Sequence, residues 1–538
     1  MKVYEAVTAT LHELGVDRVF GVMGTANMRY LATYRDARNG SYVAATHEAG
    51  AVAMADGWSR LTGRPGVATV THGPGVTNAL TALTEAARAG SSLVVLTGSA
   101  APDHSQWLDL RAAAALAGVG VHEVRGPQSV ADDVVNAVRT SCVRRRPVIV
   151  DIPVRMLSSD AGPIAARCGF GPWPVARCEP DDDVLDAALG VIASARRPLV
   201  LVGRGTVLSG ARSEVLGMAE LLNAPLATTV MAKEFCADYP MHLGIFGTES
   251  HSLAIDAINQ ADCIIVLGAA LNKDTTANGD LLRDKAVVRC DADPLVVSGG
   301  DPKWVSVLSD VKLFAAAVSD ALEELGEVRE SAWAHAIGES IKAFDSKAEF
   351  IDRSDARHVD IRSAMAMLDR ILPFPRVLVT DTGRFKTAPW RHLSCTDGAF
   401  TQSGSFKAIG LGLAMAIGAA FACRDSTTVC VAGDGGVMMA IGELTVAVEH
   451  ALPMVVAIAD DAAYGSEYTQ LEEYGHDPNY SRRQWPTFAS VAVGFGAKGY
   501  VVRDCDRLNQ LRAELADVSG PVVLDIKTNT EFNPRRYI

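Results

Sequence analysis

The stretch Thr428-Val429-Cys430-Val431-Ala432, followed directly by Gly433-Asp434-Gly435-Gly436, decides the fold. The β-branched run predicts a buried strand, the glycines predict a tight turn, and the residues from about Val437 predict a helix. A carboxylate in such a turn lies at the carboxyl end of a parallel strand, where open α/β sheets bind ligands. Glycines let the backbone approach a phosphate group, and the N-terminus of the following helix favours negative charge.

A second apolar run, Met454 to Ala459, predicts the next strand and ends in Asp460-Asp461-Ala462-Ala463-Tyr464-Gly465. If the two strands are parallel neighbours, Asp434 and Asp461 lie at the same edge of the sheet. Mg²⁺ prefers hard oxygen ligands and is usually shared between one or two carboxylates and phosphate groups of a ligand. The two runs together therefore predict a magnesium and phosphate site at this edge.

The same pattern of a β-branched run, a glycine turn and an alanine-rich amphipathic stretch recurs in three segments, which predicts an α/β protein with parallel sheets flanked by helices. We expect domains at residues 1–160, 184–326 and 357–538, with a proline-rich linker in 158–183. The predicted strands are 18–22, 42–46, 67–71, 93–97, 148–152, 198–202, 225–229, 263–267, 287–290, 376–380, 427–432, 454–459 and 522–526. The predicted helices of the first domain include 48–61 and 76–88.

Composition narrows the classes of function that this protein could have. The 538 residues are 49% hydrophobic and 21% charged, with a net charge of −13, which disfavours binding to nucleic acid or anionic membranes. The ten cysteines show no metal-ligand spacing, so we expect free thiols. The N-terminus begins an amphipathic pattern, and no apolar stretch approaches the ~20 residues that span a bilayer. We therefore expect a cytoplasmic enzyme that acts on small molecules.

At this point the sequence resembles the thiamine-diphosphate-dependent enzymes, and most closely the branch of acetohydroxyacid synthase, benzoylformate decarboxylase and pyruvate oxidase. The resemblance covers nearly the whole chain and implies pyrimidine-binding, central and diphosphate-binding domains in that order. It implies that Mg²⁺ is held by Asp434, Asp461 and the carbonyl of Ala463, and that Gly433, Gly435, Gly436, Tyr464 and Gly465 contact the cofactor. Asp460-Asp461 departs from the family's Asn-Asn, which adds negative charge beside a diphosphate and leaves the net effect on affinity open.

The second signature of the resemblance is Thr46-His47-Glu48-Ala49-Gly50-Ala51, followed by Thr71-His72-Gly73-Pro74-Gly75-Val76-Thr77-Asn78. In the family, the glutamate at the place of Glu48 hydrogen-bonds N1′ of the cofactor's aminopyrimidine and promotes loss of the proton at thiazolium C2. Gly73, Pro74 and Gly75 are expected to form a turn beside the cofactor or a neighbouring subunit. Asn78 is expected to be structural. Gly24 lies in a glycine turn that differs from those of relatives and leaves the wall on the substrate side uncertain.

Two further stretches match the family, 380–383 and 403–410. They make Gly383 a cofactor contact and Ile409 the apolar residue that wedges between the two rings of the cofactor. For the substrate, the candidates are His72, His104, Gln106, Arg384 and Lys407, each of which could instead serve a local structural role. If the two cations face the cleft, the substrate should carry an anionic group.

The resemblance implies a decarboxylase or carboligase that takes a 2-oxo acid and passes the acyl unit to a carbonyl acceptor. Two alternatives stay open: a flavin-dependent oxidase of the same branch, and a catalytically silent binding or regulatory relative. The central domain carries Val202-Gly203-Arg204-Gly205 and Gly268-Ala269-Ala270. The second turn lacks the arginine of a GAR-like sequence, which makes bound FAD doubtful. The family also implies a homodimer or homotetramer with active sites at the subunit interface.

Overall fold

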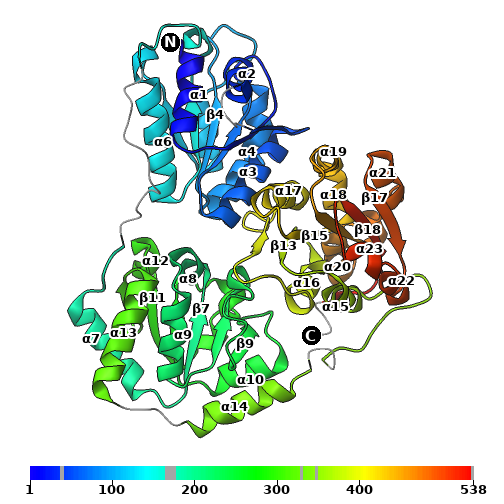
Figure 1. Ribbon diagram of the computed structural model, residues 1–538. Helices are drawn as coiled ribbons and strands as arrows, with labels where there is room; N and C mark the ends of the chain where they lie inside the picture. The colour runs from blue at the N-terminus through cyan, green and yellow to red at the C-terminus, as the bar shows by residue number, and fades with distance from the viewer. Residues whose placement is uncertain (37–40, 164–176, 327–330, 346–348, 535–538) are drawn as a thin grey trace. The chain divides into compact units, whose positions relative to one another are not determined.

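The computed structural model describes residues 1–36, 41–163, 177–326, 331–345 and 349–534. It contains three parallel six-stranded sheets with flanking helices, in three successive parts of the chain (Figure 1), which confirms the predicted fold class. Two compact units result: the first and third sheets belong to one, and the second sheet to the other. Much of the predicted linker, residues 164–176, lies outside the described residues.

The first sheet has the strand order β2-β1-β3-β4-β6-β5. Its strands are β1 (Arg18–Gly21), β2 (Ser41–Ala44), β3 (Gly66–Thr69), β4 (Leu93–Thr97), β5 (Gly120–Glu123) and β6 (Val148–Asp151). The helices are α1 (Val3–Glu13), α2 (Met28–Asp36), α3 (Glu48–Thr62), α4 (Pro74–Arg88), α5 (Leu110–Ala117) and α6 (Val130–Arg144). Helix α3 begins at Glu48 itself. Helix α4 begins at Pro74, so the predicted turn over Gly73, Pro74 and Gly75 was wrong for its last two residues, which are already helical, and only Gly73 precedes the helix.

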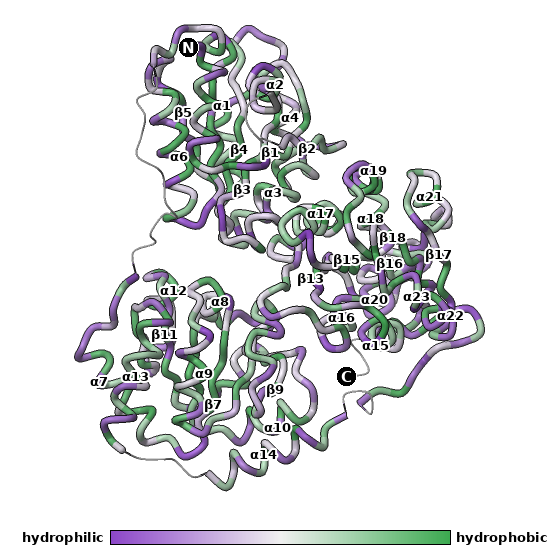
Figure 2. Tube along the Cα trace, in the orientation of Figure 1, coloured by the Kyte–Doolittle hydropathy of each residue, from purple (hydrophilic) through white to green (hydrophobic). Residues whose placement is uncertain are grey.

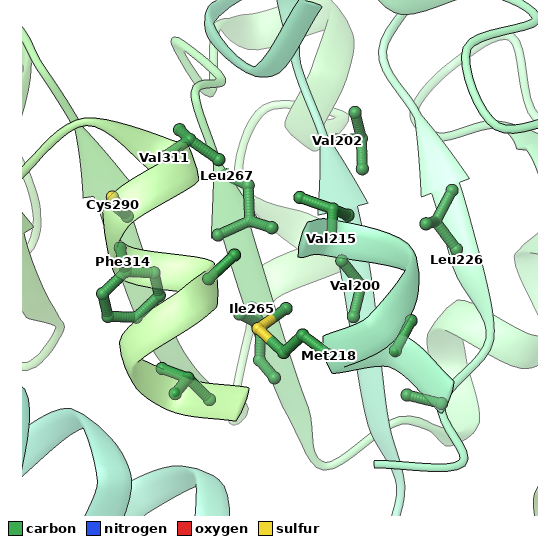
Figure 3. Close-up of a cluster of buried hydrophobic side chains, with 14 of the residues drawn as sticks. Val200, Val202, Val215, Met218, Leu226, Ile265, Leu267, Cys290, Val311 and Phe314 are labelled. Atoms are coloured by element: carbon green, nitrogen blue, oxygen red, sulfur yellow. The ribbon is translucent and has the colours of Figure 1, made fainter. Parts of the chain in front are cut away.

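The second sheet has the order β12-β11-β10-β7-β8-β9. Its strands are β7 (Pro198–Val202), β8 (Leu226–Thr228), β9 (His242–Ile245), β10 (Cys263–Leu267), β11 (Ala286–Asp291) and β12 (Val305–Leu308). Its longer helices are α7 (Asp182–Ser194), α9 (Arg212–Leu221), α10 (Ser252–Gln260), α13 (Val311–Leu325) and α14 (Ala332–Ala343). Figure 3 shows the core on one face, where Met218 of α9 and Phe314 of α13 pack against Ile265 of β10.

The third sheet has the order β14-β13-β15-β16-β18-β17. Its strands are β13 (Arg376–Thr380), β14 (Phe400–Gln402), β15 (Thr427–Gly433), β16 (Met454–Asp460), β17 (Lys498–Val502) and β18 (Val522–Lys527). Its helices include α15 (Ile361–Ile371), α17 (Gly412–Ala422), α18 (Asp434–Ala440), α19 (Leu444–Glu449), α20 (Gly465–Glu473), α21 (Phe488–Gly494) and α22 (Cys505–Gln510).

Helix α17 is apolar along nearly its whole length, as Figure 2 shows, because it is buried on all sides. It packs against α3 of the first sheet within the same compact unit. Glycines make this approach close: a Cβ added at Gly57 would lie 2.2 Å from the carbonyl oxygen of Met415, and one at Gly418 would lie 1.9 Å from that of Met54.

The predicted strands all form, with ends that shift by one or two residues, and five further strands complete the sheets. The nine cysteines among the described residues are free, as expected. None of the helices in the described ranges is long and apolar enough to cross a membrane.

Candidate functional site

Strands β15 and β16 are parallel neighbours, with Gly433 paired to Ala459. Their ends therefore place Asp434 and Asp461 at the same edge of the sheet, as the sequence predicts. The helix after β15 begins at Asp434 and not near Val437, so the prediction of its start was wrong by one turn. The reason is that the glycines after Asp434 adopt helical geometry. Asp434 thus lies in the first turn of α18, where its Oδ1 accepts a hydrogen bond from the amide of Gly435 at 2.7 Å.

Asp434 is only 3% exposed, and its Oδ2 is a buried oxygen without a hydrogen-bond partner. Burial, followed by the charges of Asp461 and Asp460, raises the pKa of Asp434 to about 8. A buried, unpartnered carboxylate oxygen beside other acids is costly unless a cation binds there. The donor set therefore fits a hard divalent cation. Among the described residues, no three His, Cys, Asp or Glu side chains form a complete metal site, so further oxygen ligands must come from the backbone or from a bound molecule.

The turn after β16 is held by hydrogen bonds from its own backbone amides to its two acidic side chains. The amide of Ala462 donates to Asp460 Oδ1 and that of Ala463 donates to Asp461 Oδ1, each at 3.1 Å. Ala462 has a φ of 53°, in the left-handed region that an alanine rarely adopts. The ring of Tyr464 covers Gly435, where an added Cβ would lie 2.7 Å from it. This packing brings the Tyr464-Gly465 turn against the glycine turn of β15.

A buried carboxylate that received no role from the sequence, Asp381, holds the loop that carries Ile409. Its Oδ1 accepts from the hydroxyl of Ser403 at 2.7 Å, and its Oδ2 accepts from the amide of Gly410 at 3.0 Å. An added Cβ at Gly436 would lie 2.6 Å from Asp381 Oδ2. The loop of Ile409 and the first turn of α18 therefore meet at Asp381.

The same loop is also tied to the first sheet. Glu85 of α4 accepts hydrogen bonds from the amides of Ser405 at 3.0 Å and Phe406 at 2.5 Å. Arg60 of α3 donates to the carbonyl of Gln402 at 2.7 Å and forms a buried salt bridge with Asp56. These fully buried charged groups fix the position of the loop relative to α3 and α4.

Glu48 is the first residue of α3 and is partly buried. Its Oε2 accepts a hydrogen bond from the side chain of Asn78 at 3.0 Å, so Asn78 is a partner that the sequence did not reveal. Directly before Glu48, the amides of Thr46 and His47 donate to the buried carboxylate of Glu443 at 3.1 and 3.0 Å. Glu443 lies in the short 3-10 helix Ile441–Glu443 that follows α18, and so the start of α3 is fixed by the segment directly after α18.

The turn at Gly73 lies beside the candidate substrate residues. Gly73 has a φ of 63°, and an added Cβ would lie 2.5 Å from the carbonyl oxygen of Gln106. The rings of His72 and His104 lie edge to face with centroids 5.6 Å apart. Burial, reinforced by His104, lowers the pKa of His72. The structure thus brings His72, His104 and Gln106 together.

Three of the predicted glycine contacts have packing roles. Cβ atoms added at Gly383 and Gly433 would lie 2.4 and 3.1 Å from the ring of Phe385. A Cβ at Gly24 would lie 2.6 Å from the side chain of Thr71. Contact of these glycines with a cofactor stays a prediction.

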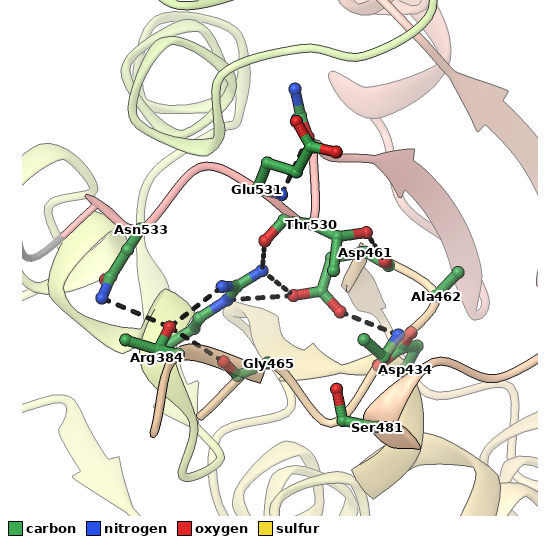
Figure 4. Close-up of polar contacts among 12 residues, drawn as sticks. Arg384, Asp434, Asp461, Ala462, Gly465, Ser481, Thr530, Glu531 and Asn533 are labelled. Atoms are coloured by element: carbon green, nitrogen blue, oxygen red, sulfur yellow. Dashed lines mark hydrogen bonds and ion pairs between the residues drawn. The ribbon is translucent and has the colours of Figure 1, made fainter. Parts of the chain in front are cut away.

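The two candidate substrate cations differ in their surroundings. Lys407 is exposed, with a φ of 62°, on the loop of Ile409. Arg384 is buried at 7% exposure and forms an ion pair with Asp461 at 2.7 Å (Figure 4). Lys407 therefore remains available to a bound molecule, whereas Arg384 is already paired with the carboxylate of Asp461.

In the central sheet, the two glycine turns considered for a flavin contact each other. The amide of Gly205 donates to the carbonyl of Gly268 at 2.8 Å, and a Cβ added at Gly203 would lie 2.2 Å from the same oxygen. The amide that a dinucleotide phosphate would need at this turn is thus occupied by the protein. The residues do not fit a flavin held by these turns.

Comparisons with known proteins agree with this architecture. Family models match three parts of the chain: the N-terminal TPP binding domain of the thiamine pyrophosphate enzymes at residues 1–119, the central domain at 185–318 and the C-terminal TPP binding domain at 381–526. Here TPP stands for thiamine pyrophosphate, which is thiamine diphosphate.

Individual relatives span nearly the whole chain. It is 26% identical over 564 residues to "Probable acetolactate synthase large subunit" of Methanococcus aeolicus, covering 97% of this chain and 91% of that protein. It is 27% identical over 540 residues to the acetolactate synthase large subunit of Parasynechococcus marenigrum, covering 97% and 86%.

Among solved structures, the thiamine diphosphate-dependent 4-hydroxybenzoylformate decarboxylase of Rhodococcus jostii RHA1 superposes with a TM-score of 0.81 at 20% identity, over 98% of this chain and 99% of that one. This similarity confirms the three-domain fold. Since a matching domain of the family accompanies each of the three sheets, the chain belongs to the thiamine pyrophosphate enzyme family.

Proposed function

We propose that this protein is an acetolactate-synthase-like enzyme that decarboxylates a 2-oxo acid, passes the resulting acyl unit to a carbonyl acceptor, or does both. One observation carries the proposal: Asp434 and Asp461 meet at the ends of neighbouring strands, and a buried oxygen of Asp434 has no partner. This is the arrangement that a metal-bound diphosphate requires. The relatives named above add the class of reaction.

In this proposal Mg²⁺ is held by one oxygen each of Asp434 and Asp461, by the carbonyl of Ala463 and by the diphosphate. The N-terminal end of α18 carries a partial positive charge, which favours a negative group at this position. Gly435 and Gly436 leave no side chain between that turn and its neighbours Tyr464 and Asp381. The residues therefore fit the diphosphate end of the cofactor.

When bound, thiamine diphosphate supplies the electron sink that allows a bond next to a carbonyl to break. Glu48 then has the task of sharing a proton with the aminopyrimidine nitrogen N1′. The hydrogen bond from Asn78 restrains one carboxylate oxygen of Glu48, and the other is left to act on the cofactor. His72, His104 and Gln106 are placed by the same domain and form the proposed substrate side.

The family arrangement assigns Glu48 and Asp434 of one chain to different active sites, so we propose a homodimer or a homotetramer as the active form. In this arrangement Glu48 and Asn78 of one copy would act on the cofactor held at Asp434 of the other.

The decisive experiment incubates the protein with thiamine diphosphate, Mg²⁺ and a panel of 2-oxo acids and aldehydes, and identifies products by mass spectrometry. We expect loss of carbon dioxide from at least one 2-oxo acid, and no product from the Glu48→Gln variant. Cofactor binding without any product from the whole panel would favour the catalytically silent relative. Failure of the wild type to bind the cofactor in calorimetry would refute the proposal.

The proposal contains no flavin, because the Gly203–Gly205 and Gly268 turns bond to each other. The purified protein is accordingly expected to lack the visible absorbance of a flavin, also after incubation with FAD. Retention of FAD through gel filtration would contradict this part of the proposal and favour the oxidase alternative.

A further inference from the structure

Arg384 and Asp461 form a buried ion pair at the metal-site edge of the third sheet (Figure 4). Arg384 follows β13, and Asp461 follows β16. The Nε and Nη2 atoms of Arg384 both donate to the same oxygen, Asp461 Oδ2, at 3.1 and 2.7 Å. The two side chains are 7% and 13% exposed. Two donors on one buried oxygen fix both its position and its charge.

Two further hydrogen bonds of Arg384 are made within the protein. Nη2 donates to the carbonyl of Thr530 at 2.5 Å, and Nη1 donates to the hydroxyl of Thr469 at 3.3 Å. The hydroxyl of Thr530 in turn donates to the carbonyl of Asp461 at 2.5 Å. Since these donors are directed at protein atoms, Arg384 acts on Asp461 and its loop and not as a clamp for a substrate anion.

The two oxygens of Asp461 therefore have separate tasks. Oδ2 is bound to Arg384, whereas Oδ1 accepts only a single backbone amide, that of Ala463 at 3.1 Å. A carboxylate oxygen has two lone pairs, so Oδ1 keeps one for a cation. An asparagine at this position would present one oxygen in the same way and would carry no charge.

The neighbouring acid is neutralised in a similar manner. Lys527, at the end of β18, forms ion pairs with Asp460 and with Asp525, the latter at 2.8 Å. Asp460 is thus paired with a cation from the neighbouring strand β18, and Asp461 with a cation from the segment after β13, two strands away in the sheet. At Asp461 a neutral ion pair stands where relatives have a neutral amide, whereas Lys527 is shared between two acids.

We propose that Arg384 is a positioning residue that neutralises Asp461, so that this acid can serve as a metal ligand without repelling the diphosphate. The inference rests on the proposed function. The sequence left open how Asp460-Asp461 affects the affinity for a diphosphate, and the inference answers that paired cations balance the added negative charge. Gly465 makes the pair possible, because an added Cβ would lie 2.3 Å from Arg384 Nε and 2.5 Å from Asp461 Oδ2.

A double-mutant cycle tests the proposal, with calorimetric affinity for thiamine diphosphate at saturating Mg²⁺ as the readout. Arg384→Gln should weaken binding by about 10- to 100-fold, the usual effect of removing a group that orients a metal ligand. Adding Asp461→Asn to that variant should restore affinity to within roughly threefold of the wild type, because the unpaired charge is removed. Arg111→Gln is the matched control, since Arg111 is 76% exposed and pairs with Glu123 of the first sheet.

Packing alone predicts a different result, in which the double variant binds no better than Arg384→Gln, and that result would overturn the inference. Arg384→Lys keeps the charge and loses the two-point contact, so its affinity for thiamine diphosphate should lie between those of the wild type and Arg384→Gln. This variant provides the test if Arg384→Gln folds poorly. Equal affinity of Arg384→Gln and the wild type would also overturn it. If the wild type itself binds no cofactor, the proposed function fails. If the wild type binds the cofactor and the double variant does not regain affinity, only the inference about Arg384 is refuted.

Discussion

Gly418→Ala should destabilise the protein, although alanine is the better helix former. Gly418 is buried in the middle of α17, and the new Cβ would lie 1.9 Å from the carbonyl oxygen of Met54 and 2.8 Å from its Cα, both in the backbone of α3. Real Cβ contacts below 3.0 Å are essentially unknown, so α17 and α3 must separate by about 1 Å. No change of rotamer relieves a clash with backbone.

The expected cost follows from two opposing terms. Overpacking of a buried interface costs about 1 to 3 kcal/mol or more, and the gain in helix propensity offsets up to about 1 kcal/mol. We expect a net loss of about 2 kcal/mol, which for a unit of this size corresponds to a melting temperature lower by roughly 3 °C. Because α3 begins at Glu48, the same movement should also disturb this glutamate, for which we propose the catalytic role.

Thermal unfolding followed by circular dichroism measures the effect, and Gly190→Ala is the control. Gly190 is an exposed residue of α7, and an added Cβ there meets nothing within 4 Å. This variant should be slightly stabilised, by about 0.5 to 1 kcal/mol. The reasoning is refuted if Gly418→Ala melts at or above the temperature of the wild type, because α3 and α17 would then not be in close contact.

Three other variants test the site and the central sheet. Glu48→Gln should bind thiamine diphosphate, but its rate of proton exchange at C2 should fall by about 10²- to 10⁴-fold, since an amide cannot share the N1′ proton. Proton NMR of exchange into D₂O measures this rate. A variant that exchanges at the wild-type rate would remove Glu48 from its role. Asp434→Ala should abolish Mg²⁺-dependent cofactor binding in calorimetry, and unchanged binding would contradict the metal site. Burial lowers the pKa of His242 to about 4, so the unfolded state binds more protons below pH 6.5 and stability should fall as the pH is lowered from 6.5 to 4. His242→Gln should remove roughly 2 kcal/mol of that fall, and denaturation at both pH values checks it.

The buried strands were predictable, and the edges of the sheets were not. Every strand that the sequence failed to reveal (β5, β9, β12, β14 and β17) lies at the edge of its sheet. An edge strand bonds to one neighbour only and keeps part of its side chains in solvent, so it lacks the continuous apolar run of a central parallel strand. β17, with four of its five residues at least partly exposed, is an example.

The residues of the candidate site also divide into those that a local pattern predicts and those that only the fold brings together. The common edge of Asp434 and Asp461 follows from two short patterns and the geometry of parallel strands. The hydrogen bonds of Glu443 to the start of α3 join residues 396 and 397 positions apart, and the pairing of Arg384 with Asp461 spans 77 positions. A single sequence contains no local signal for such pairs, because the fold alone brings them together. This is why Arg384 could be noticed as a cation near the site and still be assigned to the substrate.

The ion pair of Arg384 and Asp461 also constrains how such a site can evolve. A change of Asp461 to the family's asparagine leaves a buried arginine unpaired, and a loss of Arg384 leaves a buried acid unpaired, each at a cost of several kcal/mol. Both intermediate sequences are therefore less fit than either end point. The two positions should change together along the lineage, and natural relatives that carry an acid at the second position of this turn should retain a cation at the position of Arg384. Once acquired, the acidic form of the metal site is difficult to reverse by single substitutions.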